Sequence, residues 1–194
     1  MRINKLVIAT ANAGKFREFH ELAKDFVSEI IFAPETAKLI VEETGKTYSE
    51  NAMLKASAWA KSSGLPCLAD DSGLEVNALD GAPGLYSARI IQGSDKNKVS
   101  WLLDSLRDKS DRTARFAASL ALCVPDDYML ICEGFCYGTI AKAPMGNNGF
   151  GYDPVFIPEG YNKTFAELDP DIKNSISHRY NAFRKIINIL NLSK

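Results

Sequence analysis

Two long apolar segments in the middle of the chain, residues 114–124 and 128–140, constrain the fold most strongly. Both are rich in residues that favour β-strands, and the short polar turn at 125–127 between them predicts an antiparallel hairpin. The N-terminal region has a different pattern, with a buried strand over 5–10, a tight Asn/Gly loop and then helical spacing. We therefore expect an α/β fold with a mixed sheet.

The rest of the chain supplies further helices and strands. Five apolar residues recur at helical spacing after the first strand: Phe16, Phe19, Leu22, Ala23 and Phe26. The Gly-Leu-Pro sequence at 64–66 is a stop signal for a preceding helix. The other predicted elements are strands over 30–33, 67–70 and 155–156 and helices over 49–62, 99–106 and 182–190.

Length and composition limit the number of domains and the kinds of partner. A chain of 194 residues with 46% hydrophobic residues fits a single domain, residues 1–194, with two lobes that share a core. The 23 Lys and Arg nearly balance the 24 Asp and Glu, which argues against a polynucleotide or a membrane surface as partner but allows a small anion. The apolar segment at 6–9 is too short for a signal peptide, so we expect a cytoplasmic protein.

Cysteine and histidine usage narrows the metal chemistry. Cys67, Cys123, Cys132 and Cys136 lie in apolar, strand-like sequence without a C-x-x-C spacing, so buried reduced thiols are expected. With only two histidines, a His-rich zinc site is not expected. A hard cation bound by carboxylates is the metal chemistry that remains.

Two adjacent carboxylates, Asp70 and Asp71, follow an apolar run and precede Ser72 and Gly73. Neighbouring side chains on a strand point to opposite faces, so only one of the two carboxylates can face a given cleft and the other is structural. A solvated turn is the alternative interpretation of the same residues. In company with Glu42 or Glu43, one of these aspartates would bind Mg²⁺ together with substrate phosphate oxygens.

Residues 10–15, Thr-Ala-Asn-Ala-Gly-Lys, lie between the first strand and the first helix. Free backbone N–H groups at such a helix start, with Thr10, Asn12 and Lys15 beside them, favour an anion. The spacing departs from the P-loop pattern, and ordinary turn chemistry is the other interpretation. Further on, Asn51 and Lys55 share one face of a predicted helix.

A second group of polar and aromatic residues occurs near the C-terminus. Residues 149–154 alternate glycines with Phe150 and Tyr152, so a planar ligand can approach the backbone and stack on a ring. Packing against the following strand is an equally good interpretation of these rings. Hydrogen-bond donors collect before the last helix, at Lys173, Ser177, His178 and Arg179.

Taken in order, these segments resemble the successive motifs of the HAM1/RdgB family of inosine/xanthosine triphosphate pyrophosphatases. The resemblance extends from about residue 6 to residue 187. The motifs are Thr10–Lys15, Glu42–Gly45, Glu50–Ala56, Ala69–Val76, Gly81–Arg89, Gly149–Phe156 and Ser177–Arg179.

The resemblance implies a fold, an activity and a set of residue roles. The fold would be an elongated mixed β-sheet flanked by helices, with two lobes around a central nucleotide-binding cleft, in a homodimer. The activity would be Mg²⁺-dependent hydrolysis of ITP, dITP and XTP to the monophosphate and pyrophosphate, which cleanses the nucleotide pool. Thr10, Asn12, Lys15 and Lys55 would hold the triphosphate, Glu42 and Asp71 the metal, and Asp71 would accept the proton of the attacking water. Ser72, Phe150, Gly151, Tyr152, Asp153, Lys173, His178 and Arg179 would enclose the nucleoside.

Two other functions are compatible with parts of the pattern. A Maf-like pyrophosphatase for modified pyrimidine nucleotides would share the architecture, but the segment at 149–154, which we call the aromatic loop, and the Ser177-His178-Arg179 sequence are not expected in it. A non-catalytic nucleotide sensor would not need Asp71 beside a metal.

Overall fold

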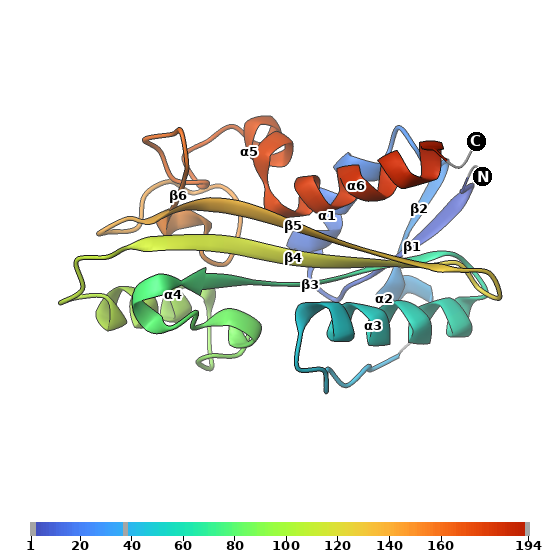
Figure 1. Cartoon of the computed structure of the whole chain (residues 1–194), viewed down its shortest axis with the longest axis horizontal. Helices are drawn as coiled ribbons and strands as arrows, with labels where there is room; N and C mark the ends of the chain where they lie inside the picture. Colours follow the sequence, from blue (N-terminus) through green and yellow to red (C-terminus); the bar gives the residue numbers. More distant parts are fainter. Residues whose placement is uncertain (1–2, 37–38, 193–194) are drawn as a thin grey trace. The chain divides into compact units, whose positions relative to one another are not determined.

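The structure is a computed structural model that describes residues 3–36 and 39–192. Six strands are hydrogen-bonded in the order β2-β1-β3-β4-β5-β6 (Figure 1). The strands are β1 Lys5–Ala9, β2 Glu29–Phe32, β3 Cys67–Val76, β4 Thr113–Cys123, β5 Met129–Ile140 and β6 Phe156–Pro158. The α-helices are α1 Ala13–Ala23, α2 Ala33–Thr36, α3 Tyr48–Ser63, α4 Asp95–Ser105, α5 Pro170–Ile176 and α6 His178–Leu192. Short 3₁₀ helices span Asn77–Leu79, Gly84–Tyr86 and Asp153–Val155.

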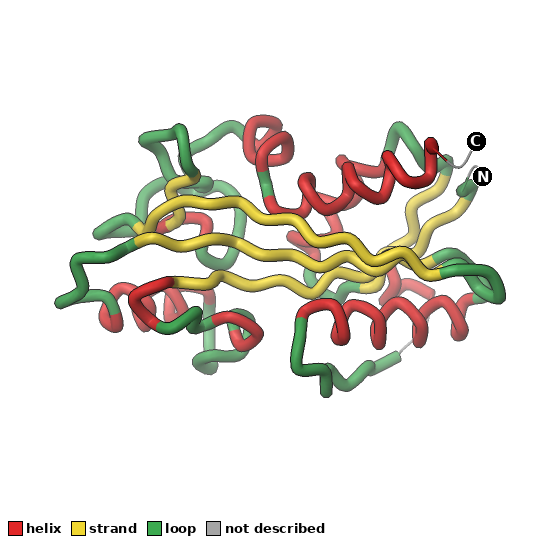
Figure 2. Tube along the Cα trace, viewed as in Figure 1, coloured by secondary structure: helices red, strands yellow, loops and turns green. Residues whose placement is uncertain are grey.

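The sheet contains both parallel and antiparallel pairs, which confirms the predicted mixed α/β fold. Figure 2 shows the strands of this sheet together with the helices of the chain. β1 runs parallel to β2 and to β3, and β5 runs antiparallel to β6. β4 and β5 are neighbours joined by a tight turn, in which the Val124 N–H donates to the Tyr128 carbonyl oxygen at 2.9 Å. Such a short connection allows only an antiparallel hairpin.

The chain divides into two compact units. The first unit comprises Met1–Asp71, Ala118–Gly134 and Arg179–Lys194, and the second comprises Ser72–Ala117 and Phe135–His178. The three longest strands, β3, β4 and β5, contribute residues to both units. Each unit has its own hydrophobic core and is described separately below.

The core of the first unit has two layers because side chains on β1 alternate between the faces of the sheet. Leu6 and Ile8 pack with residues of α1 and α6 on one face. Val7 and Ala9 pack with α3 on the other face, where Ala52, Ala56 and Ala60 leave room for close helix–sheet contact. The sheet of this unit therefore has helices on both faces, which is the layer arrangement expected of an α/β fold.

The core of the second unit forms around the far end of β3. Leu74 and Val76 are fully buried and belong to one cluster with Leu102 of α4, Phe116 of the neighbouring β4 and Phe156 of β6. The three phenylalanines of this core, Phe116, Phe156 and Phe165, contact one another with ring centroids 4.6 to 6.0 Å apart. The contacts between these three rings form part of the hydrophobic core of the second unit.

β3 differs from its predicted form, since it does not end in a turn after Asp70. The strand continues through Ser72 and Gly73 to Val76, and both aspartates lie inside it. The burial of Leu74 and Val76 shows the reason, because the apolar alternation resumes beyond the polar residues. The interpretation of Ser72 and Gly73 as turn residues was therefore wrong.

Several helix predictions also need correction. α1 ends at Ala23, and Phe26, assigned by its spacing to the apolar face of that helix, lies beyond the helix with 46% of its surface exposed. The helix predicted over 99–106 begins at Asp95, directly after Ser94. The short helices α2 and α5 were not predicted. The four cysteines are free thiols as expected, although Cys123 is only partly buried.

Candidate active site

The polar residues of the first unit gather where β1 ends. Ala9, the last residue of β1, pairs with Ala69 of β3, so Asp70 and Asp71 lie just beyond the end of the shorter strand. Loops that follow the carboxyl ends of parallel strands are the usual place for ligands in α/β sheets. Alternation along β3 gives each aspartate its own set of partners, as predicted from their adjacency.

Asp70 is held by cations from two helices. Its Oδ2 lies 2.6 Å from Nζ of Lys15 in α1 and 3.5 Å from Nε of Arg179 in α6, and its side chain is fully buried. The Arg179 guanidinium also donates to Oε2 of Glu18 at 2.8 Å. Burial raises the pKa of Asp70, but the charges of Lys15 and Arg179 more than offset this, so the pKa lies below the ordinary value. Asp70 is therefore ionised and structural.

Asp71 is held more loosely, by side chains of α3. Asn51 donates to Oδ2 at 3.0 Å, and Nζ of Lys55 lies 3.7 Å from Oδ1. Burial raises the pKa of Asp71 above its ordinary value, although Lys55 and Asn51 act in the opposite direction and Glu43 reinforces the rise. A carboxylate with a raised pKa is a better proton acceptor than a free one.

Lys55 connects the two aspartates and a glutamate. Its Nζ donates to the Asp70 carbonyl oxygen at 2.7 Å and to Oε1 of Glu43 at 2.6 Å. We call Lys15, Lys55, Asp70, Asp71 and Arg179 the carboxylate cluster. The structure thus brings together Lys15, Lys55, Asp71 and Arg179 of the predicted site, all within the first unit.

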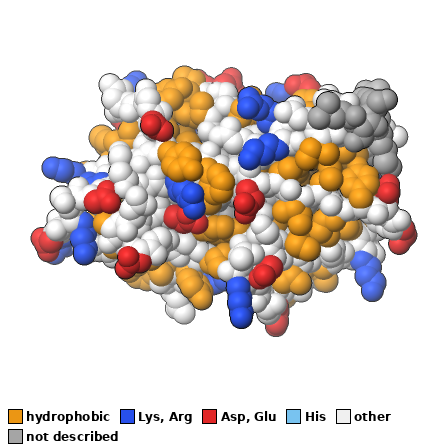
Figure 3. Space-filling model, in the orientation of Figure 1, with side chains coloured by type: hydrophobic (Ala, Val, Ile, Leu, Met, Phe, Trp, Pro, Cys, Tyr) orange, Lys and Arg blue, Asp and Glu red, His pale blue; other side chains and the backbone are white. Residues whose placement is uncertain are grey.

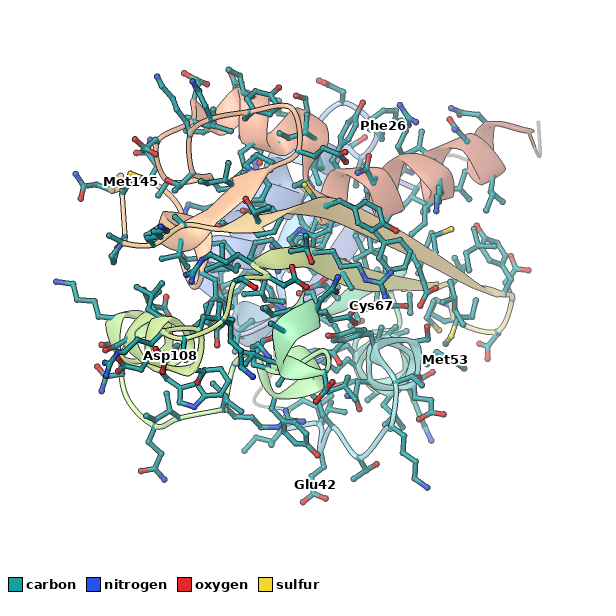
Figure 4. The ribbon with its side chains drawn as sticks, turned by 60° about the vertical axis from the view of Figure 1, so that its left-hand side comes forward. Phe26, Glu42, Met53, Cys67, Asp108 and Met145 are labelled. Carbon is teal, nitrogen blue, oxygen red and sulfur yellow. The ribbon has the colours of Figure 1, made fainter. Side chains whose placement is uncertain are left out.

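Of the two candidate glutamates, the structure brings Glu43 to this cluster. The Glu43 carboxylate lies beside Lys55, whereas Glu42 is exposed and its side chain points away from the ribbon (Figure 4). The assignment of Glu42 to a metal stays a prediction.

The chemistry of the carboxylate cluster fits Mg²⁺. Asp71 and Glu43 supply oxygen ligands of the kind that Mg²⁺ prefers, at a site shared with a lysine that can bind phosphate. Within residues 3–36 and 39–192, no group of three or more His, Cys, Asp or Glu side chains is placed to hold a metal ion. A metal here would therefore need further ligands from substrate and water, which is how Mg²⁺ is usually held with nucleotides.

The loop before α1 uses several of its backbone donors internally. The Asn12 side-chain oxygen accepts from the N–H groups of Gly14 and Lys15, at 2.8 and 3.1 Å, and Thr10 Oγ1 accepts from the Asn12 N–H at 3.1 Å. The expectation of free backbone N–H groups was wrong for these three positions. An anion would instead meet the Asn12 side-chain amide, the Thr10 hydroxyl and Lys15.

The second unit contains a different group of site residues. Lys173 of α5 lies 2.5 Å from Oδ2 of the buried Asp153, which also accepts from the Phe150 N–H at 2.8 Å. The Lys173 ammonium lies 4.9 Å from the centroid of the Phe150 ring. His178 is buried and stacks on Phe116 with centroids 4.7 Å apart. We call Phe150, Tyr152, Asp153, Lys173 and His178 the aromatic cluster.

Tyr152, Gly151 and Ser72 complete the predicted residues of the second unit. Tyr152 is buried, and its hydroxyl donates to the Ser87 carbonyl oxygen at 3.2 Å. The Gly151 N–H donates to Asp95 of α4 at 2.8 Å. Ser72 is partly buried on β3, next to Asp71 in the chain. Arg179 lies in the first unit and belongs to the carboxylate cluster, and its predicted contact with the nucleoside stays a prediction.

Four polar contacts of these clusters were not predicted from the sequence, those of Glu18, Asn51, Ser87 and Asp95. For two of these residues the sequence did contain a local indication. Glu18 follows Lys15 by three positions and Asn51 precedes Lys55 by four, so each pair lies on one face of a helix. Ser87 and Asp95 contact residues far away in the chain, and helical or strand periodicity carries no information about such contacts.

Comparison with known proteins identifies the family of the chain. The model of the Ham1 family matches residues 6–189. The chain belongs to the Ham1 family. It is 48% identical over 187 residues to a protein of Rhodospirillum centenum named dITP/XTP pyrophosphatase, covering 94% of this chain and 92% of that one. An Aquifex aeolicus protein of the same name is 44% identical, with 96% of each chain covered.

A solved structure of a relative shares the fold of this Ham1 family chain. The structure of a HAM1 protein from Coxiella burnetii has a TM-score of 0.86 at 42% identity, and the alignment covers 97% of this chain and 99% of that one. Membership of the Ham1 family sets the Maf-like alternative aside.

Proposed function

We propose that this Ham1 family chain hydrolyses non-standard purine nucleoside triphosphates, namely ITP, dITP and XTP, to the monophosphate and pyrophosphate. The observation that carries the proposal is the environment of Asp71, a largely buried carboxylate of raised pKa whose Oδ1 lies 3.7 Å from Nζ of Lys55. The relatives from Rhodospirillum centenum and Aquifex aeolicus are named for this activity.

The carboxylate cluster would bind the triphosphate. Lys15 and Lys55 offer ammonium groups, and the side chains of Thr10 and Asn12 add neutral donors. These charges reduce the repulsion between an attacking nucleophile and the phosphates, and they stabilise the charge that develops in the transition state. Asp71 orients the attacking water and accepts its proton, while Asn51 keeps the carboxylate in place.

A bound Mg²⁺ would be held by Asp71 together with Glu42 or Glu43 and by the substrate phosphates. When bound, it would polarise the phosphoryl oxygens and neutralise part of their charge. The charge balance of the described groups supports this proposal. Lys15, Lys55 and Arg179 carry three positive charges, and Glu18, Glu43, Asp70 and Asp71 carry four negative ones. A polyphosphate alone would meet a slight excess of negative charge, which a divalent cation reverses.

The aromatic cluster would receive the base. The Phe150 ring supplies a stacking face, with Tyr152 beside it in the same loop, and Lys173 and His178 supply polar groups at the edge of this aromatic surface. Hypoxanthine and xanthine carry a carbonyl oxygen at position 6, where adenine carries an amino group. A buried site that offers only donors accepts the first two bases and leaves donors unpaired against adenine, which costs orders of magnitude in rate.

A product assay with a nucleotide panel tests the proposal. We expect ITP, dITP and XTP to yield the monophosphate and pyrophosphate, with ATP and GTP turned over slowly and with no turnover after chelation of the metal. Inosine diphosphate and orthophosphate as products would contradict attack between the α and β phosphates. Tight binding of ITP without any product would instead indicate a nucleotide sensor.

A homodimer in the cytoplasm is also part of the proposal. β5 exposes the large apolar side chains of Ile131, at 40%, and Tyr137, at 53% exposure. Exposed hydrophobic side chains also form groups on the face shown in Figure 3. Such surface is often covered by a second subunit. No helix of the described residues has the length and apolar character to cross a bilayer. Light scattering gives the mass in solution, and a monomer at working concentration would contradict the dimer.

A further inference from the structure

We propose that Asp95, the first residue of α4, is a positioning residue that fixes the aromatic loop and thereby contributes to recognition of the base. Its Oδ2 accepts a hydrogen bond of 2.8 Å from the Gly151 N–H, between Phe150 and Tyr152. Asp95 and Gly151 are 56 positions apart in the sequence but lie in the same compact unit. The inference rests on the proposed function, because it assigns a role within that site.

The loop needs such a contact because its glycines give it little conformational restraint. Gly149 and Gly151 have positive φ angles of 76° and 62°, which side chains other than glycine rarely adopt. On the side of Phe150, the loop is held by the bond from its N–H to Asp153. The Asp95 bond holds the next N–H along the chain. The two carboxylates together hold two consecutive peptide groups and thus the backbone position from which the Phe150 side chain extends.

Asp95 is itself held in place by its own helix. Lys98, one turn later, lies 3.0 Å from the other carboxylate oxygen of Asp95, and the Lys98 side chain is mostly buried. Partial burial raises the pKa of Asp95, but the bonds from Gly151 and Lys98 outweigh this effect and leave the pKa below its ordinary value. The carboxylate is therefore charged at neutral pH, and a charged acceptor makes a stronger bond than a neutral one.

A role in the helix alone is the competing explanation. An aspartate in the first turn stabilises a helix through its dipole, whatever the rest of the protein does. That role predicts a change in stability and none in substrate recognition. The two explanations are separable because helix stabilisation alone changes neither KM nor the exchange of the loop amides. Asp104, in the last turn of α4, pairs with Arg107 at the same i,i+3 spacing and is the control for the loss of such an ion pair.

The test compares Asp95→Ala with the matched control Asp104→Ala. For Asp95→Ala we expect KM for dITP to rise about tenfold, the change associated with losing one charge-assisted bond that orders a binding loop. The preference for dITP over dATP should fall, and kcat should change little because Asp71 and its partners lie in the first unit. Asp104→Ala should leave all three quantities at the wild-type values.

Two further measurements complete the design. Asp95→Asn keeps an oxygen that can accept from Gly151, so it should recover part of the lost KM. Hydrogen exchange of the amides at 150–152 should be faster in Asp95→Ala than in the wild type and in Asp104→Ala, and this measurement needs no substrate.

The outcomes separate this inference from the proposed function. Unchanged exchange at 150–152, or an unchanged KM and preference in a folded Asp95→Ala protein, overturns the positioning role even when the wild type cleaves dITP. A wild type that fails to cleave any of the nucleotides overturns the proposed function, and faster exchange in the variant would then still show that Asp95 orders the loop.

Discussion

Each unit contains a lysine paired with a buried aspartate, and the two pairs have very different surroundings. Lys15 and Asp70 are 2.6 Å apart among further charges, those of Arg179, Lys55 and Glu18. Lys173 and Asp153 are 2.5 Å apart among aromatic rings and a backbone N–H. The same type of ion pair thus lies in two environments, one rich in charged groups and one rich in aromatic rings.

The difference shows which properties of a pair matter for function. In the carboxylate cluster, the pKa values of the two aspartates shift in opposite directions: the charges of Lys15 and Arg179 outweigh burial and lower that of Asp70, whereas burial dominates and raises that of Asp71. Two neighbouring carboxylates with separated pKa values indicate a structural group and a reactive one. In the aromatic cluster, Asp153 instead orients Lys173 and the loop. The predictions below test this division of roles, from the largest expected effect to the smallest.

Asp71→Asn should abolish most of the turnover while the fold survives. The amide keeps the size of the carboxylate but cannot accept a proton, so we expect kcat to fall by at least roughly 10²- to 10⁴-fold. Initial rates with ITP measure the effect, and circular dichroism checks the fold. Near-normal turnover in a folded variant would show that Asp71 does not accept the proton. The carboxylate cluster would then have no residue assigned to the chemical step.

Lys15→Met should destabilise the protein by about 3 to 5 kcal/mol, because it leaves Asp70 buried with one fewer cation. The low pKa of Asp70 in the folded state means that its charge contributes stability above the ordinary pKa of 3.8, and this contribution is lost as the pH falls through the folded value. In the variant, burial without the ammonium raises the pKa of Asp70. The difference in stability should therefore be largest at neutral pH and shrink on acidification.

Urea unfolding at a series of pH values measures this difference. The matched control is Lys5→Met, which removes an exposed ion pair with Glu29 in which both side chains are 52% exposed. That change should cost less than about 1 kcal/mol. A loss of stability in Lys15→Met that does not vary with pH would show that the ammonium acts by packing and not through the charge of Asp70.

The contrast between the clusters also explains which features could be predicted from sequence. The opposite orientations of Asp70 and Asp71 follow from strand alternation alone, so adjacency in the sequence was sufficient. The length of β3 was not predictable from residues 72 and 73, since Ser and Gly occur in turns as readily as at a buried strand position beside a ligand. The strand continues past Ser72 and Gly73 because Leu74 packs in the core of the second unit.

The remaining differences arise from loop conformation and long-range contacts. Whether Glu42 or Glu43 meets Lys55 depends on the path of a loop, and two identical neighbours give no sequence signal for it. His178 and Arg179 are consecutive at the start of α6, but they belong to different units and have different partners. The proposal that both bind the base was reasonable from their adjacency. The ion pairs of Arg179 with Glu18 and Asp70 now favour the phosphate end for its guanidinium.

Arg179→Ala distinguishes these two roles. If the guanidinium acts with the carboxylate cluster, kcat/KM should fall by a similar factor for ITP and ATP, by roughly 10- to 100-fold for the loss of a charged hydrogen-bond donor. If it acts on the purine edge, the loss should fall on ITP and leave the slow ATP reaction nearly unchanged. Arg184→Ala, on the same helix but more exposed, is the control and should change neither rate.

Phe150→Leu should have the smallest effect and should be confined to the nucleoside. Leucine keeps an apolar side chain at the tip of the loop but removes the ring, so the expected loss is about 0.5 to 1.5 kcal/mol of stacking energy. Because every base has a π-face, the affinities for IMP and AMP should fall by similar factors, while the affinity for pyrophosphate with Mg²⁺ should not change. Calorimetric titration with the three ligands measures this, with Phe26→Leu as the control for loss of an exposed ring in the first unit. A weaker affinity for pyrophosphate in Phe150→Leu would mean that the loop also acts on the phosphate groups. That result would contradict the division of roles between the two clusters.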